Sequence, residues 1–164
     1  MVDADYDTVF RAEHDAIVRS AFLVTGDRET AREVAQEAFA ELHRHWRKVR
    51  HYDRPGAWLR RVAIRKAVRV KQRRPDVGVL PDDLTSAGPE VDVGAATLDV
   101  LRALRRLSPS QRAAIVLHYF EDRPVGEVAE ALGCKPATAS VHLHRARNRL
   151  AELLGEEVET DVPG

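Results

Sequence analysis

The sequence has a single cysteine, a single methionine, few aromatic residues and no net charge. One cysteine, Cys134, excludes an internal disulfide framework and is typical of a reducing compartment. No uncharged run approaches the roughly 20 apolar residues that span a bilayer. The first residues, MVDADYD, are acidic, whereas a secretory signal starts with basic and then apolar residues. We therefore expect a cytoplasmic protein without membrane insertion.

The composition that is present points to a globular protein. Of the 164 residues, 44% are hydrophobic and 32% are charged. This content is too apolar for an intrinsically disordered chain and too polar for a membrane protein. The length suits one ordinary domain or two small ones.

The zero net charge conceals two basic blocks. Residues 54–75 carry nine Lys and Arg and no acid, and residues 100–155 carry nine bases against five acids. Between them, residues 76–99 carry six acids and no base. This pattern indicates two sites for a polyanion, joined by a segment that avoids both. The alternative is that each block is a solvated helix face.

Hydrophobic residues recur with a helical period nearly everywhere outside the acidic segment, and no stretch favours a strand. The predicted fold class is all-α, with two small helical domains joined by an extended linker. The boundaries expected are residues 1–75 for the first domain, 76–97 for an acidic linker rich in Pro and Gly, 98–155 for the second domain and 156–164 for an acidic tail.

In the first domain, a helix from about Tyr6 is expected to end at Gly26, and Asp27 is expected to cap a second helix. The apolar stripe of that second helix continues to Val49. A third helix begins at Pro55, a residue suited to a first turn. Its nine basic residues are predicted to point outward. Its predicted inward residues are Trp58, Leu59, Val62, Ala63, Ala67 and Val70.

In the second domain, residues 108–111 (SPSQ) form a capping-box pattern that starts a helix reaching about Phe120. Residues 124–150 then resemble a helix-turn-helix, with Gly133 in the turn and a small residue, Ala129, where the helices cross. The second helix of such a motif enters the DNA major groove. Its predicted outward residues are Ala137, Ser140, Val141, His144, Arg145 and Asn148.

Together the two halves resemble a known family. RETAREVAQEAFAELHRHW (28–46) and GAWLRRVAIRKAVRVKQRR (56–74) resemble region 2 of extracytoplasmic-function (ECF) sigma factors of bacterial RNA polymerase. Residues 108–154 resemble region 4 of the same family, and the TGDRETA segment looks most like actinobacterial members. The resemblance covers about residues 6–154. It implies a protein that binds core polymerase and directs promoter recognition.

The resemblance assigns roles to residues by position. Region 4 of the family contacts the −35 promoter element through residues that match Ser140, Val141 and His144, with Arg145 nearby. Region 2 binds the −10 element through the part that matches residues 55–74. The candidates in and before that helix are His51, Tyr52, Arg60, Arg61, Arg65, Arg69 and Arg73.

Three of these assignments add detail. Lys135 occupies the N-cap position of the last helix, where it is a poor cap, and we predict that it holds a phosphate. His51 and Tyr52 are our candidates for capturing an extruded base, whereas Trp58 is in phase with core residues. The exposed residues that match the surface docking on the polymerase β′ coiled coil are Glu33, Gln36 and Glu37.

The partners implied are core RNA polymerase, through its β′ coiled coil and β subunit, promoter DNA and, as the usual regulator in the family, an anti-sigma factor. No catalytic constellation is apparent, and we expect no enzyme activity, cofactor or metal site. Two alternatives remain open from the residues alone. One is a helix-turn-helix regulator that acts without polymerase docking, and the other is a helical adaptor protein.

Overall fold

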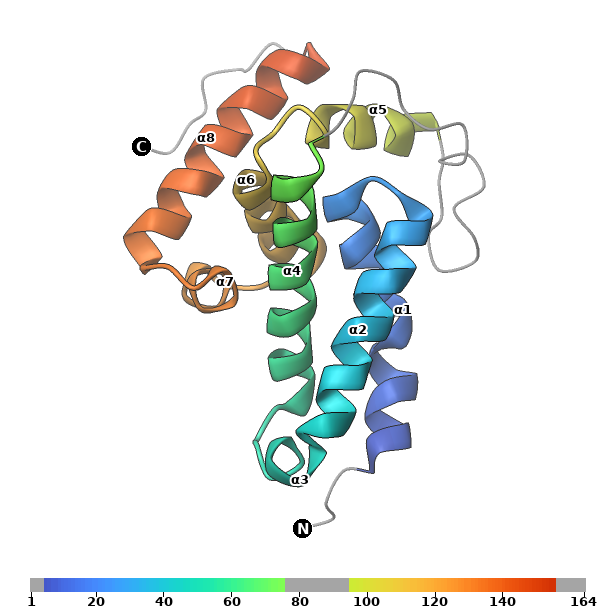
Figure 1. The fold of residues 1–164 in the computed structure, drawn as a ribbon. Coiled ribbons are helices and arrows are strands. Elements are labelled where there is room, and N and C mark those ends of the chain that lie inside the picture. The colour runs from blue at the N-terminus through green and yellow to red at the C-terminus, as the bar shows by residue number, and fades with distance from the viewer. Residues whose placement is uncertain (1–4, 76–94, 156–164) are drawn as a thin grey trace.

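The structure is a computed structural model that describes residues 5–75 and 95–155, with side chains from residue 98 onward in the second range. All regular elements in these two ranges are helices (Figure 1). Most of the predicted linker (76–97) and the whole predicted tail (156–164) lie outside the described residues.

The first two helices begin and end where local chemistry predicts. Helix α1 (Tyr6–Thr25) stops at Gly26, which has φ +70° and donates its N–H to the carbonyl oxygen of Phe22 at 2.7 Å. Helix α2 (Arg28–Arg44) starts after Asp27, whose carboxylate accepts the Thr30 N–H at 2.9 Å. The predicted left-handed C-terminus and N-cap are therefore confirmed.

The second helix is shorter than its apolar stripe predicts, so the expectation of one continuous helix to Val49 is wrong. It ends at His45 (φ −100°, ψ 11°), and a separate turn, α3 (Trp46–Val49), follows. The break lets the Trp46 ring pack edge-on against Tyr6, with centroids 5.7 Å apart, while Val49 stays buried. Tertiary packing thus overrides the helical period at this point.

Helix α4 (Pro55–Arg73) lies centrally in the molecule, between α1 and α2 on one side and α6 and α7 on the other (Figure 1). Leu59 and Ala63 are buried against α1 and α2, as predicted. Ile64, which was not among the predicted inward residues, is 1% exposed and belongs to a different cluster. Helix α4 is therefore buried on two sides.

The second half begins with α5 (Ala95–Leu104), which starts inside the range predicted as linker. Helix α6 (Pro109–Ile115) has the predicted capping box. The Ser108 hydroxyl accepts the Gln111 backbone N–H, and the Gln111 side-chain oxygen accepts the Ser108 backbone N–H. The helix then continues as a π-helical turn, η2 (Val116–Phe120), in place of the regular α-helix expected. The remaining helices are α7 (Val125–Leu132) and α8 (Pro136–Leu154).

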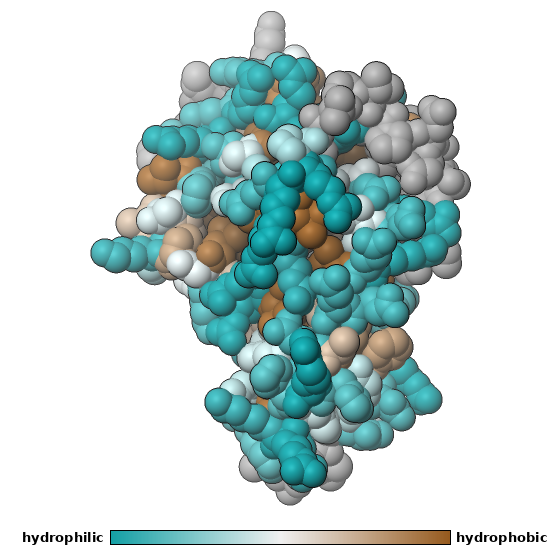
Figure 2. Space-filling model, in the orientation of Figure 1, coloured by the Kyte–Doolittle hydropathy of each residue, from teal (hydrophilic) through white to brown (hydrophobic). Residues whose placement is uncertain are grey.

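The two halves share a hydrophobic core. One cluster contains Phe22 and Ile64 from the first half together with Leu104 and Leu117 from the second, all 1% exposed. The sequence predicted two modules on a tether and did not predict that they pack against each other. The face drawn in Figure 2 is largely hydrophilic, with apolar patches between the polar side chains.

Candidate nucleic-acid interface

Helix α8 separates a buried stripe from an exposed face. Ala139, Leu143 and Ala146 are at most 1% exposed and pack against the rest of the second half. The opposite side presents the predicted DNA-contacting residues, all of which are exposed: Lys135, Ser140, Val141, His144 and Arg145. The structure therefore brings these residues together on one surface.

The turn before α8 sets this orientation. Gly133 has φ +71°, a conformation that costs glycine little, and the Cys134 N–H donates to the Ala129 carbonyl oxygen at 3.0 Å. Ala129 itself is 2% exposed. Lys135 makes no side-chain capping bond at the start of α8, as its type predicts. The helix-turn-helix geometry predicted from the sequence is thus present.

The basic face of α4 differs from the prediction. Arg69 and Arg73 near its C-terminal end are exposed, as expected. Arg60, however, has a side chain only 12% exposed, so the prediction that all nine bases point outward is wrong. Arg61 and Arg65 also reach α7, because α7 packs directly on this side of α4. The physical reason is complementary charge: α7 and the preceding turn carry acids.

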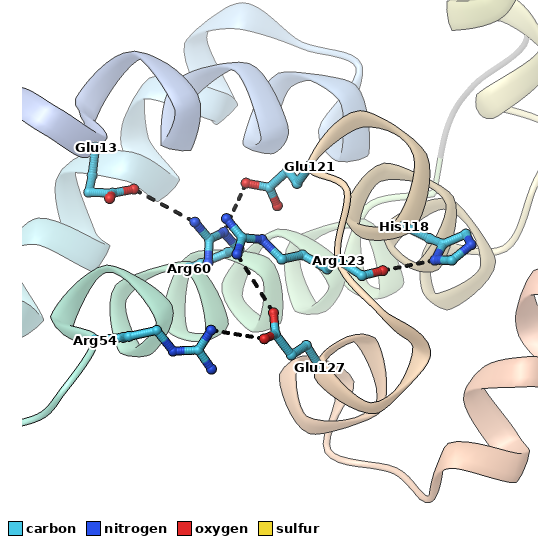
Figure 3. Close-up of polar contacts among 7 residues, drawn as sticks. All are labelled: Glu13, Arg54, Arg60, His118, Glu121, Arg123 and Glu127. Atoms are coloured by element: carbon cyan, nitrogen blue, oxygen red, sulfur yellow. Dashed lines mark hydrogen bonds and ion pairs between the residues drawn. The ribbon is translucent and has the colours of Figure 1, made fainter.

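Arg54, which precedes α4, and Arg60 of α4 form a network with the second half (Figure 3). The Arg60 Nε donates to Glu121 Oε1 at 3.0 Å, and its Nη2 lies 3.8 Å from Glu13 Oε2. The Arg54 Nη1 donates to Glu127 Oε1 at 2.9 Å, and the other Glu127 oxygen lies 3.7 Å from Arg123 Nη1.

Two further arginines on α4 extend the network toward the end of α7. The Arg65 guanidinium donates to the carbonyl oxygens of Ala131 and Glu130, both at 3.0 Å. Arg61 lies 3.9 Å from the Glu130 carboxylate. These backbone oxygens are among the last carbonyls of α7, which carry partial negative charge, and that of Glu130 also accepts the Gly133 N–H at 3.2 Å.

Burial and charge move two carboxyl pKa values in opposite directions. Glu121 is 9% exposed, and its removal from water raises its pKa, although Arg60 opposes the shift. The hydrogen bond from Arg54 holds the pKa of Glu127 below its usual value. Sequence reasoning missed both residues. The signal available was the cluster of acids in residues 121–130 of an otherwise basic half.

The loop before α4 borders a cavity of about 450 Å³ at the junction of the halves. Of the two predicted base-capturing residues, Tyr52 is 40% exposed and lines the cavity, and His51 is also exposed. Trp58 is partly buried against the core, as predicted, and also lines this cavity. The other lining residues are Asp53, Arg54, Ala57, Arg60, Arg61, Leu117, Arg123, Glu127, Glu130 and Ala131.

The residues predicted to face the polymerase form a separate surface. Glu33, Gln36 and Glu37 are exposed on the outer side of α2. Lys66 of α4 lies 3.9 Å from the Glu37 carboxylate and 3.1 Å from that of Glu41. Gln36 also borders a groove of about 430 Å³ between α1 and α2 that contains several aromatic rings.

His118 was expected to be a core or interface residue. It is half-buried, and its Nδ1 lies 2.8 Å from the Arg123 carbonyl oxygen, so it braces the turn that carries Glu121 (Figure 3). Among residues 5–75 and 95–155, no cluster of His, Cys, Asp and Glu has the make-up of a metal site. In the same ranges no helix is long and apolar enough to cross a membrane.

Comparison with known proteins identifies both halves. The family model of sigma-70 region 2 matches residues 9–74, and that of sigma-70 region 4 matches residues 97–150. An RNA polymerase sigma-E factor from Streptomyces avermitilis is 31% identical over 160 residues, which cover 92% of this chain and 85% of that protein. The ECF sigma factor SigM from Mycobacterium tuberculosis is 28% identical over 151 residues, covering 92% and 77%.

The fold also has a close structural counterpart. The sigma factor RpoE from Bartonella quintana, solved in complex with the anti-sigma factor NepR, superposes with a TM-score of 0.69 at 23% identity. The match covers 93% of this chain and 98% of that one. The order of the two regions and the length of the matches exclude a chance resemblance of the helix-turn-helix alone. The chain therefore belongs to the ECF group of sigma-70 family sigma factors.

Proposed function

We propose that three surfaces of this sigma factor have separate roles in promoter-directed transcription. Helix α2 binds core polymerase, α4 binds the −10 element and α8 recognises the −35 element. The observation that carries the proposal is the segregation of charge. The outer side of α2 presents Glu33, Gln36 and Glu37 beside the exposed Arg32 and Arg44, whereas α4 has no acid and the exposed charges of α8 are mostly arginines. Acidic surfaces suit a basic protein partner, and arginines suit phosphates.

The −35 contact is assigned to the exposed face of α8. Ser140, Val141 and His144 lie toward its N-terminal half, the part that approaches base edges in a helix-turn-helix. Arg145 is placed beside them, where it can contact phosphate, and Lys135 precedes the helix. Ser140 is short, so we expect DNA shape to contribute to the preference.

The −10 contact is assigned to α4 and the loop before it. Arg69 and Arg73 are exposed and can follow the phosphate backbone, while Tyr52 beside the junction cavity offers a ring on which an extruded base can stack. Arg60, Arg61 and Arg65 belong to the same basic face. Arg60, whose side chain is 12% exposed, can contribute only when Glu121 no longer pairs with it, whereas Arg61 and Arg65 remain partly accessible beside α7.

The chemistry of RNA synthesis belongs to the polymerase in this proposal, and the chain itself is not an enzyme. Its place of action is the cytoplasm, where promoter DNA and polymerase meet. The paired match of regions 2 and 4 favours this function over a helix-turn-helix regulator that works without polymerase and over an adaptor that binds no DNA.

Reconstituted transcription tests the proposal. We expect core polymerase mixed with the full chain to start RNA at defined sites on genomic fragments, and core polymerase alone not to do so. A triple variant, Glu33→Ala with Gln36→Ala and Glu37→Ala, should lose co-purification with core polymerase. Glu152→Ala, which removes an exposed carboxylate on α8, should retain it. If no fragment supports initiation at a defined site, the proposed function is refuted.

A further inference from the structure

We propose that the junction cavity binds a free aromatic α-amino acid. This inference goes beyond the proposed function, since it concerns a small zwitterionic ligand and neither polymerase nor promoter DNA. It is carried by the chemistry of the lining, in which cations, anions and aromatic rings surround one space. The volume of about 450 Å³ lies within the range of ordinary small-molecule sites.

The lining of the junction cavity carries both signs of charge in nearly equal number. Its charged members are four arginines and three carboxylates, namely Arg54, Arg60, Arg61, Arg123, Asp53, Glu127 and Glu130. Arg60 is also neutralised by Glu121, which is not part of the lining, at 3.0 Å. A balanced lining favours a ligand without net charge, and its separate charges favour one charged group of each sign. A zwitterion has both properties.

One ion pair of the lining is loose. Arg61 and Glu130 approach only to 3.9 Å, beyond hydrogen-bond range, and their side chains are 33% and 70% exposed. By contrast, the Arg54 Nη1 donates to Glu127 Oε1 at 2.9 Å. The carboxylate of an amino acid can accept two hydrogen bonds from the Arg61 guanidinium, while its ammonium donates to Glu130. Because separating a loose, exposed pair costs little, such a ligand can insert between the two side chains.

Aromatic and aliphatic side chains of the lining provide a place for a ring. Tyr52 and Trp58 both line the cavity, and Tyr52 is 40% exposed, so its ring is available to a ligand. Leu117, Ala57 and Ala131 add aliphatic surface. Aromatic rings that stack or meet edge to face gain free energy beyond the area that they bury. An amino acid with an aromatic side chain therefore contacts the whole lining, whereas one with a small side chain uses only its charges.

Two helices from different halves of the chain position these groups. Trp58 and Arg61 are three residues apart on α4 and so share one face of that helix. Glu127 and Glu130 are also three residues apart on α7, which packs on α4. Figure 3 shows Arg54 and Glu127 facing each other across this junction. Because the site needs both halves, the ligand should bind the folded chain only and raise its Tm.

Four small molecules test the ligand class on the full chain. L-Phenylalanine has all the required features, whereas phenethylamine lacks the carboxylate, 3-phenylpropionate lacks the ammonium and L-alanine lacks the ring. Isothermal titration calorimetry measures their dissociation constants. We expect saturable binding of L-phenylalanine and at least about tenfold weaker binding of each of the others, because a charge-assisted hydrogen bond or a buried ring contributes that factor or more.

The two tryptophans of the chain report where the ligand binds. Trp58 lines the cavity, whereas Trp46 packs on Tyr6 and is not part of the lining. In heteronuclear NMR spectra of the nitrogen-labelled chain, L-phenylalanine should shift the indole N–H signal of Trp58 and leave that of Trp46 in place. The variant Trp46→Phe assigns the two signals.

Substitutions of the loose ion pair test the residues. Arg61→Met removes the partner of the ligand carboxylate, and Glu130→Gln removes the charge that faces the ammonium. Each should weaken binding of L-phenylalanine by about tenfold. The matched control is Arg102→Met, which removes an arginine of α5 outside the cavity and should leave the dissociation constant unchanged. Far-UV circular dichroism checks folding, and Glu130→Gln changes an exposed side chain to one of equal size, so it tests the site even if Arg61→Met fails to fold.

Absence of saturable L-phenylalanine binding would overturn the inference, as would equal affinity for 3-phenylpropionate or a shift of the Trp46 signal in place of that of Trp58. Adenosine monophosphate is a further probe. If it shifts the Trp58 signal and binds more tightly than L-phenylalanine, the cavity is a nucleotide site and the inference is wrong. None of these measurements involves polymerase, so failure of this inference and failure of the proposed function are separate outcomes.

Discussion

Arg112 offers the sharpest test of how the two halves are held together. It lies on α6, is 1% exposed and donates across the junction to the Val24 carbonyl oxygen at 2.6 Å. Its Nη2 also donates to the carbonyl oxygens of Arg105 and Leu107, both at 3.2 Å. Val24 lies in the last turn of α1, where carbonyls have no helical partner. A buried cation is favourable at such a helix end.

Arg112→Met keeps much of the side-chain volume and removes the guanidinium that makes these three hydrogen bonds. At about 1 kcal/mol for each lost hydrogen bond, the free energy of unfolding should fall by about 3 kcal/mol. For a chain of this length such a loss lowers Tm by about 6–12 °C. Arg112→Lys, which keeps the charge but not the fork of donors, should lie between wild type and the Met variant.

Urea denaturation followed by far-UV circular dichroism measures this change. The matched control is Arg102→Met on α5, where the side chain is 60% exposed and pairs with Asp99 one turn away. We expect that control to lose less than about 0.5 kcal/mol. Equal losses for the two Met variants would show that the contacts of Arg112 do not stabilise the junction, and the reasoning above would be refuted.

Three other predictions follow from local features. Gly26→Ala forces φ +70° on alanine and should destabilise the chain by about 1 kcal/mol, whereas Gly126→Ala, inside α7 with no neighbour near its added Cβ, should stabilise it by about 0.5–1 kcal/mol in thermal melts. Burial raises the pKa of Glu121, so the folded state binds its proton more tightly than the unfolded chain. Its contribution to stability is therefore greatest below the ordinary carboxyl pKa and is lost as the pH rises through the raised value. The unfolding free energy of wild type should therefore rise relative to that of Glu121→Gln as the pH falls. A difference between the two that does not depend on pH would contradict this. Ser140→Ala or His144→Ala should alter −35 preference in reconstituted transcription while core-polymerase binding stays intact; loss of core binding would show that this face is misassigned.

Local patterns in the sequence predicted most helix ends correctly, because caps and turns depend on a few neighbouring residues. Asp27, Ser108, Gly26 and Gly133 each act as their type predicts. The break at His45 and the π-helical turn after Ile115 were not predictable in this way. The break at His45 accompanies the packing of Trp46 on Tyr6 of α1, a contact between helices that a helical period cannot represent.

The exposed face of α8 was also accessible to sequence reasoning, since a buried stripe at helical spacing defines its opposite side. The exposed face of α4 could not be predicted in the same way. Its periodicity gives one buried side, yet Ile64 and Arg60 lie on a second one. A helix packed between two partners has two buried faces, and charged residues on one of them look solvated until the partner with opposite charge is known.

The sequence by itself determined the helices, the helix-turn-helix and the family, because these depend on local propensity, spacing and motif order. Only the tertiary structure decided which arginines are available to DNA. That question depends on contacts between Arg54, Arg60 and Arg65 and residues more than 60 positions away. Such long-range pairing follows from the packing of complementary surfaces, which no single segment of the chain encodes.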